Sequence, residues 1–109
     1  HINASKDYIY AHIKERITIE DLADELGVSA SYLSRLFKKE TGLSVSSYIR
    51  QQKIEIAKNL LRFSDSSMIE IANQLAFSSQ SHFIQQFREV TGMTPKKYRD
   101  ESRLNPWDD

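Results

Sequence analysis

The chain has 109 residues, enough for one small domain or for two lobes that share a core. Fifteen Lys and Arg balance fifteen Asp and Glu, so the net charge of zero gives no sign of a nucleic-acid partner. The absence of cysteine excludes disulfides, cysteine-based zinc sites and thiol catalysis. Three Gly and two Pro among many helix-favouring residues predict an all-α fold.

No apolar run approaches the ~20 residues of a membrane span, and the N-terminus lacks the pattern of a signal peptide. We therefore expect a cytoplasmic protein that makes no membrane contact. Because the chain begins at His1 rather than at Met, we expect it to be a fragment of a longer protein.

Two copies of one unit follow each other along the chain. Residues 18–26 match residues 67–75 at an offset of 49, as from Thr18 to Ser67. From residue 29 onward the offset is 50, as from Phe37 to Phe87. The domain is therefore a tandem repeat, with one residue added in the second copy between positions 76 and 79.

An N-terminal helix is predicted over about residues 4–15, and the first copy follows it with two more helices. Thr18 and Asp21 have the spacing of a capping box, in which a hydroxyl and an acid bind the free N–H groups of a helix start. A helix over about residues 19–26 follows, and Gly27 then permits the positive φ of a tight turn.

The second helix of this copy spans about residues 30–41, with Ser29 as its cap and Gly42 at its end. A long helix follows Ser44 over about residues 45–62. Because its apolar stripe is too wide for one contact face, we expect it to pack against both copies.

The second copy repeats this arrangement with its own capping box, cap and glycine, which are Ser67 with Glu70, Ser78 or Ser79, and Gly92. Its first helix is predicted over about residues 68–75. Thr94 then caps a last helix with Pro95 at the favoured first position. The tail after Arg103, which ends in Asp108 and Asp109, is expected to be irregular.

Together these elements predict seven helices in three segments. They are a first helix-turn-helix subdomain over residues 1–43, a linker helix over residues 44–63, and a second helix-turn-helix subdomain with a C-terminal helix over residues 64–109.

Two motifs resemble the DNA-binding domain of AraC-type transcription regulators. The first is the run LSRLFKKETG at residues 33–42, and the second extends from Ile71 to Arg99. The resemblance covers residues 4–99 and implies two helix-turn-helix units, each with its second helix in a major groove of DNA. Ala76 departs from the Gly that is usual in the family, so we expect a strained turn if its φ is positive.

The resemblance implies a bacterial transcription regulator, such as an activator, that binds double-stranded DNA sequence-specifically. It also implies an effector-binding or signal-receiving domain in the missing N-terminal region, and RNA polymerase is a second partner to consider. The linker helix of about 18 residues spans roughly 27 Å, close to the ~34 Å between successive major grooves. Both units are thus expected to bind neighbouring turns of the duplex.

Helical periodicity separates the outward from the inward side chains of the second helix in each copy. The residues expected to be inward are Leu33, Leu36, Phe37, Phe83, Phe87 and Val90. Those expected to be outward are Ser31, Ser34, Arg35, Lys38, Gln80, Ser81, Gln85 and Arg88. His82 and Ile84 are expected at the flanks of the second of these helices.

The resemblance implies base contacts from the first two turns of these helices, which correspond to Ser31, Ser34, Arg35, Gln80, Ser81, His82 and Gln85. Arg35 can donate two hydrogen bonds to guanine, and Gln80 or Gln85 can pair with adenine. Other interpretations stay open. Arg35 also fits a phosphate contact or an ion pair with Glu40, and the two glutamines need no function on a solvated helix. Ile84 fits a thymine methyl group or packing against a helix.

Phosphate contacts are expected from basic side chains and from backbone N–H groups at helix starts. These candidates are Lys38, Lys39, Ser44, Arg50, Lys53, Ser79, Arg88, Thr94, Lys96, Lys97 and Arg99. His82 has no partner histidine at ligand-like spacing, and no catalytic motif occurs, so we expect no metal, no cofactor and no enzyme activity. A helical protein-interaction module with little DNA affinity is the alternative that the zero net charge favours.

Overall fold

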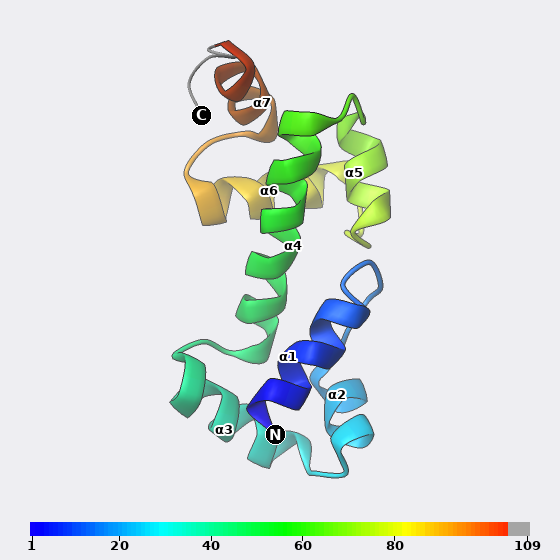
Figure 1. Cartoon of the computed structure of the whole chain (residues 1–109), viewed down its shortest axis with the longest axis vertical. Coiled ribbons are helices and arrows are strands. Elements are labelled where there is room, and N and C mark those ends of the chain that lie inside the picture. The colour runs from blue at the N-terminus through cyan, green and yellow to red at the C-terminus, as the bar shows by residue number, and fades with distance from the viewer. Residues whose placement is uncertain (105–109) are drawn as a thin grey trace. The chain divides into compact units, whose positions relative to one another are not determined.

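The computed structural model describes residues 1–104, and the predicted irregular tail at residues 105–109 lies outside the described residues. The described part contains seven α-helices and no strand, which confirms the all-α prediction (Figure 1). The helices are α1 (Ile2–Ala11), α2 (Ile19–Leu26), α3 (Ala30–Thr41), α4 (Val45–Phe63), α5 (Met68–Gln74), α6 (Gln80–Thr91) and α7 (Pro95–Leu104). None of the helices within residues 1–104 is long and apolar enough to cross a membrane.

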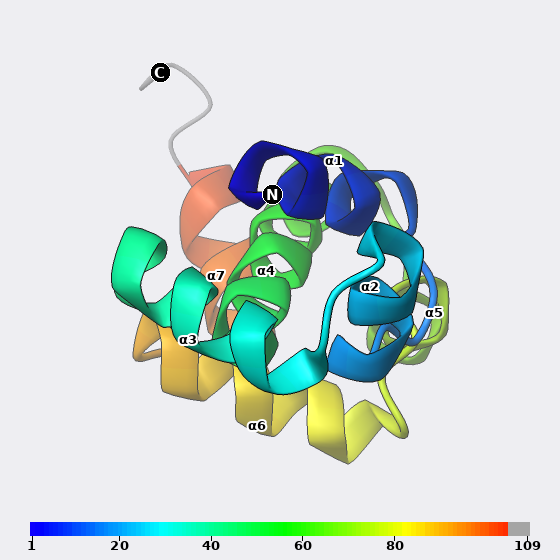
Figure 2. The same cartoon turned by 90° about the horizontal axis from the view of Figure 1, so that it is seen from below.

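The chain forms two units, and the boundary between them falls inside α4, after Gln52. In the first unit α1 packs against α2 and α3 (Figures 1 and 2). The early turns of α4 join this unit, because Ile49 is buried and the ring of Tyr48 lies 5.2 Å from that of Phe37. The later turns of α4 belong to the second unit.

The core of the second unit consists of one cluster of fully buried apolar side chains. Its members are Ile54, Ala57, Leu61, Ile71, Ala72, Leu75, Phe83 and Phe87. Since the first three lie on α4, this helix contributes to the cores of both units, as its wide apolar stripe predicts.

The first helix ends earlier than predicted. α1 begins at Ile2 and ends at Ala11, with His12 as its C-cap, whereas the sequence predicts a helix over residues 4–15. Beyond α1 the N–H of Glu15 donates to the carbonyl of His12 at 2.9 Å, and the His12 Nδ1 lies 2.9 Å from the Glu15 Oε2. This turn leaves the helix and still buries Ile13, so the apolar pattern continues although the helix does not.

The ends of α3 and α6 contain the same hydrogen-bond network. The hydroxyl of Thr41 donates to the carbonyl of Phe37 at 2.7 Å, and its oxygen accepts the N–H of Leu43 at 3.1 Å. The second copy repeats these bonds at 2.8 and 3.2 Å through Thr91, Phe87 and Met93. The repeat found in the sequence is therefore a repeat of contacts as well.

The two turns use the same backbone conformation with different residues. Gly27 ends α2 with a φ of 69°, and Ala76 follows α5 with a φ of 58°, the only positive φ of a non-glycine residue in the part that the structure describes. An added Cβ at Gly27 would meet no atom within 4 Å. The cost of alanine in such a turn is therefore conformational and not a clash.

We expect Ala76→Gly to raise the free energy of unfolding by about 0.5–1 kcal/mol, because relief of the left-handed conformation outweighs the added chain entropy. Gly27→Ala is the matched control and should lower it by a similar amount. Urea denaturation of both variants measures the two effects. A loss of stability in Ala76→Gly would show that the turn is not strained.

Candidate nucleic-acid interface

The second helix of each copy is held at its start by a serine cap. The hydroxyl oxygen of Ser29 accepts the N–H of Tyr32 at 3.1 Å, and that of Ser79 accepts the N–H of His82 at 3.0 Å. Leu33 on α3 and Phe83 on α6 occupy equivalent positions on the inner faces of these helices, and both are fully buried. Each helix is thereby fixed against its own unit, with its opposite face outward.

The outer face of α3 consists of Ser31, Ser34, Arg35 and Lys38, and all four side chains are exposed. They follow the i, i+3, i+4, i+7 spacing of one helix face. Phe37 lies on the opposite side and is fully buried. The prediction is confirmed for these side chains and for Leu33, whereas Leu36, also expected to be inward, is half-buried.

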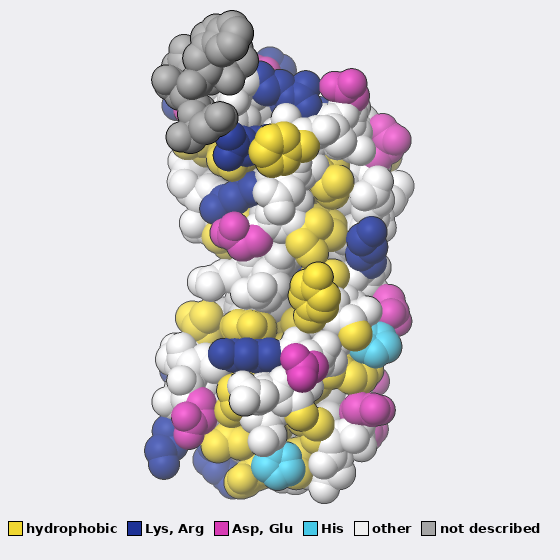
Figure 3. Space-filling view, in the orientation of Figure 1, with side chains coloured by type: hydrophobic (Ala, Val, Ile, Leu, Met, Phe, Trp, Pro, Cys, Tyr) yellow, Lys and Arg dark blue, Asp and Glu magenta, His cyan; other side chains and the backbone are white. Residues whose placement is uncertain are grey.

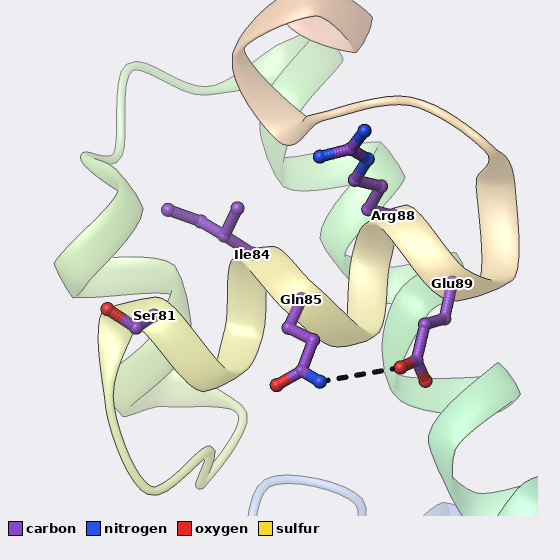
Figure 4. Close-up of a pocket in the computed structure, with 5 residues that line it drawn as sticks. All are labelled: Ser81, Ile84, Gln85, Arg88 and Glu89. Atoms are coloured by element: carbon purple, nitrogen blue, oxygen red, sulfur yellow. Dashed lines mark hydrogen bonds between the residues drawn. The ribbon is translucent and has the colours of Figure 1, made fainter.

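The outer face of α6 consists of the equivalent residues Ser81, Ile84, Gln85 and Arg88 (Figure 4). Three of them are exposed, whereas Ile84 is half-buried and packs against the edge of the core. Gln80, also proposed to contact bases, is exposed at the first position of the helix.

Glu89 also reaches this surface and was not among the predicted site residues. The Gln85 Nε2 donates to the Glu89 Oε1 at 3.5 Å (Figure 4). The i, i+4 spacing of the two residues is the signal that predicts such a contact. The bond restricts the orientation of an amide that is a candidate for base contact.

His82 is half-buried and takes part in the turn before α6. Its Nδ1 accepts the N–H of Ser78 at 3.3 Å, and its ring lies edge-on to Phe77 with 5.5 Å between centroids. This bond leaves Nε2 as the nitrogen that can donate outward from the neutral ring. In the described part of the chain, no group of three or more His, Cys, Asp or Glu could hold a metal ion.

Most of the predicted phosphate contacts lie where a phosphate could approach. The exposed basic side chains are Lys38, Lys39, Arg88, Lys96 and Lys97, and Arg50 is half-buried. Lys96 and Lys97 also pair with acids one turn along α7, at 3.3 and 4.0 Å. The hydroxyls of Ser44, Ser79 and Thr94 each accept a backbone N–H at the start of a helix.

Lys53 is a correction to the predicted phosphate contacts. Its side chain is only 6% exposed, and its Nζ donates to the carbonyl of Leu75 at 2.6 Å. The same ammonium lies 5.8 Å from the centroid of the Phe77 ring, and burial lowers the pKa of Lys53. Lys53 therefore stabilises the turn around Ala76 and does not present its charge to a ligand.

Arg99 is a second correction. Its Nε donates to the carbonyl of Leu61 at 3.0 Å, and its guanidinium also bonds to the carbonyls of Leu60 and Ser64. The carbonyls of Leu61 and Ser64 lie at the end of α4, where helical N–H partners run out, whereas that of Leu60 also accepts the N–H of Ser64. Arg103 adds bonds to Ser64 and Asp65. Both arginines thus fasten α7 to the end of α4.

Charge is mixed over the surface in each unit. On the face in Figure 3, Lys and Arg side chains alternate with Asp, Glu and uncharged groups. Four acids are exposed on α2, namely Glu20, Asp21, Asp24 and Glu25. Since the outer face of α3 itself contains only basic and neutral side chains, the neutral total conceals a local separation of charge.

A helix, a tight turn through a positive φ and a capped second helix with a polar outer face occur twice in the chain. By its fold, the chain is a tandem helix-turn-helix protein. A family model described as a helix-turn-helix domain matches residues 22–101.

A relative of known name is also a helix-turn-helix protein. The chain is 37% identical over 100 residues to the HTH-type transcriptional regulator YobQ of Bacillus subtilis, which covers 92% of this chain and 42% of YobQ. The chain thus spans less than half the length of this relative.

Two solved structures share the fold over nearly the whole chain. A transcriptional regulator from Chromobacterium violaceum, described as an AraC-type DNA-binding domain-containing protein, has a TM-score of 0.87 at 29% identity and covers 94% of this chain and 91% of that chain. The DNA-binding domain of AdpA, solved in complex with a target DNA, has a TM-score of 0.91 at 26% identity and covers 99% and 97%. The chain belongs to the AraC-type helix-turn-helix family.

Proposed function

We propose that the chain binds double-stranded DNA sequence-specifically through the outer faces of α3 and α6. The repetition of one exposed helix face, at the same place in both copies, supports this proposal most strongly. The related AdpA domain was solved with its target DNA, which supports the same partner here. Each second helix would enter a major groove, and the two units would contact successive turns of the duplex.

The two outer faces differ, so the DNA site would be asymmetric. At equivalent positions α3 has Arg35 and α6 has Gln85. Arg35 is suited to guanine and Gln85 to adenine, because each side chain matches the hydrogen-bonding edge of that base in the major groove. Exposed Lys38, Lys39 and Lys97 would contact phosphates without selecting a sequence.

The chain would act as the DNA-binding part of a bacterial transcription regulator and not as an enzyme. Its relative YobQ, named as a transcriptional regulator, is longer, which supports a further domain that binds an effector or receives a signal. The regulator would work in the cytoplasm, where RNA polymerase is the further partner of promoter-bound regulators.

A salt titration tests the proposal. If the chain contacts ~5–7 phosphates, a plot of log affinity against log salt concentration should have a slope near −5. The chain should also bind a random duplex at low salt. Fluorescence anisotropy with a labelled random duplex and a selected duplex measures both. If no duplex binds at low salt, the proposal is wrong, and the zero net charge would then favour a helical protein-interaction module.

A further inference from the structure

A shallow hollow lies on the outer face of α6. It is lined by Ser81, Ile84, Gln85, Arg88 and Glu89, all from this one helix (Figure 4). Ile84 and Arg88 extend along one side and Gln85 and Glu89 along the other, as the i, i+4 spacing requires. The hollow therefore opens away from the unit, toward any ligand that this face contacts.

Most of the surface that lines the hollow is apolar, although four of its five residues have polar or charged groups. Ile84 is the one aliphatic residue in the lining, and the methylene groups of Gln85 and Arg88 can add apolar surface. Because Ile84 is half-buried against the core, its position is fixed before any ligand binds. A small apolar group could be accommodated there without displacing a polar side chain.

The equivalent face of α3 has no aliphatic side chain at this position. Ser34 takes the place of Ile84, and Arg35 takes the place of Gln85. The aliphatic side chain at this position is thus specific to the second copy and is no consequence of the repeat.

We propose that this hollow binds the C5-methyl group of a thymine, which makes Ile84 a specificity-determining residue. The inference rests on the proposed function. Thymine is the only DNA base that presents a methyl group in the major groove, and aliphatic side chains recognise it there. Its neighbour Gln85 has the chemistry to pair with an adenine, so both residues favour a site rich in A·T pairs.

Glu89 supports this arrangement by orienting Gln85. One N–H of the Gln85 amide donates to the Glu89 carboxylate, while the amide oxygen and the second N–H stay available. Recognition of adenine needs one acceptor and one donor. The bonded amide still offers this pair beside the hollow.

The test uses a duplex selected from random sequence by the intact chain, with each thymine replaced singly by deoxyuridine. This replacement removes only the methyl group. We expect one such replacement, in the part of the DNA site that α6 contacts (the half-site of the second copy), to weaken binding about threefold to fivefold. The measurement is fluorescence anisotropy of the native chain, so it does not depend on the folding of a variant.

Two variants complete the test. In Ile84→Ser, which introduces the residue found in the first copy, deoxyuridine at that position should no longer change the affinity. In Ile69→Ser, which makes the same change at an exposed position of α5 outside the proposed interface, the sensitivity should persist unchanged. The inference is overturned if no thymine is sensitive in the native chain, or if Ile84→Ser keeps the same sensitivity. Failure to select any duplex would instead overturn the proposed function.

Discussion

Replacing Phe87 by alanine should lower the free energy of unfolding by about 3–5 kcal/mol. Phe87 is fully buried in the core of the second unit, with ring centroids 5.9 Å from Phe83 and 5.6 Å from Tyr98. The substitution removes these aromatic contacts and leaves a cavity that fixed helices fill only in part. A small domain has only about 5–15 kcal/mol of stability, so much of it would be lost.

Urea denaturation followed by circular dichroism measures this loss. Phe63→Ala is the matched control, because Phe63 is 75% exposed and should change stability by less than about 0.5 kcal/mol. Loss of DNA affinity in Phe87→Ala should follow the unfolded fraction. A cost below about 1 kcal/mol would mean that the second unit does not depend on this aromatic cluster.

Arg35→Ala should reduce discrimination between the preferred site and its single-base variants by about 1–3 kcal/mol at one base pair, or roughly 5- to 150-fold. Arg35 is exposed in the middle of the outer face of α3, and alanine retains the helix. The variant should therefore unfold as the native chain does. Gln85→Ala should act in the same way at a different base pair, in the half-site of the second copy.

Competition binding against a series of single-base variants measures this discrimination. Lys97→Ala is the comparison, because an exposed lysine that contacts phosphate should weaken all duplexes alike and reduce the salt slope by about 1. If Arg35→Ala also weakens all duplexes equally, Arg35 contacts a phosphate and reads no base. That outcome would assign sequence discrimination to α6 alone.

The helices follow from local signals in the sequence. Ser29, Ser67 and Ser79 each cap the helix predicted to follow them, and the Ser67 N–H donates to the Glu70 carboxylate as a capping box requires. This bond lowers the pKa of Glu70. Caps and turns depend on residues a few positions apart, so the sequence contains enough information to place them.

The inward and outward faces of α3 and α6 also follow from the sequence. Phe37 and Phe87 are buried, and Arg35 and Gln85 are exposed, as helical spacing predicts. The sequence left the sign of φ at Ala76 open, and the structure shows that it is positive, as it is at Gly27 in the first copy. For the two faces, the period of the helix or the repeat relates an unknown position to a known one.

The tertiary structure alone decided the roles of three basic residues. Lys53 bonds to a carbonyl 22 residues away, and Arg99 and Arg103 bond to carbonyls 35 to 39 residues away. The sequence around a basic residue is the same whether its side chain faces solvent or bonds to a distant carbonyl. Spacing along the chain therefore cannot distinguish a phosphate contact from a structural one. Local signals along the chain predict most helix bounds, the repeat and the outward faces, because these depend on residues a few positions apart. Which charges stay available on those faces depended on contacts between distant segments, which only packing creates.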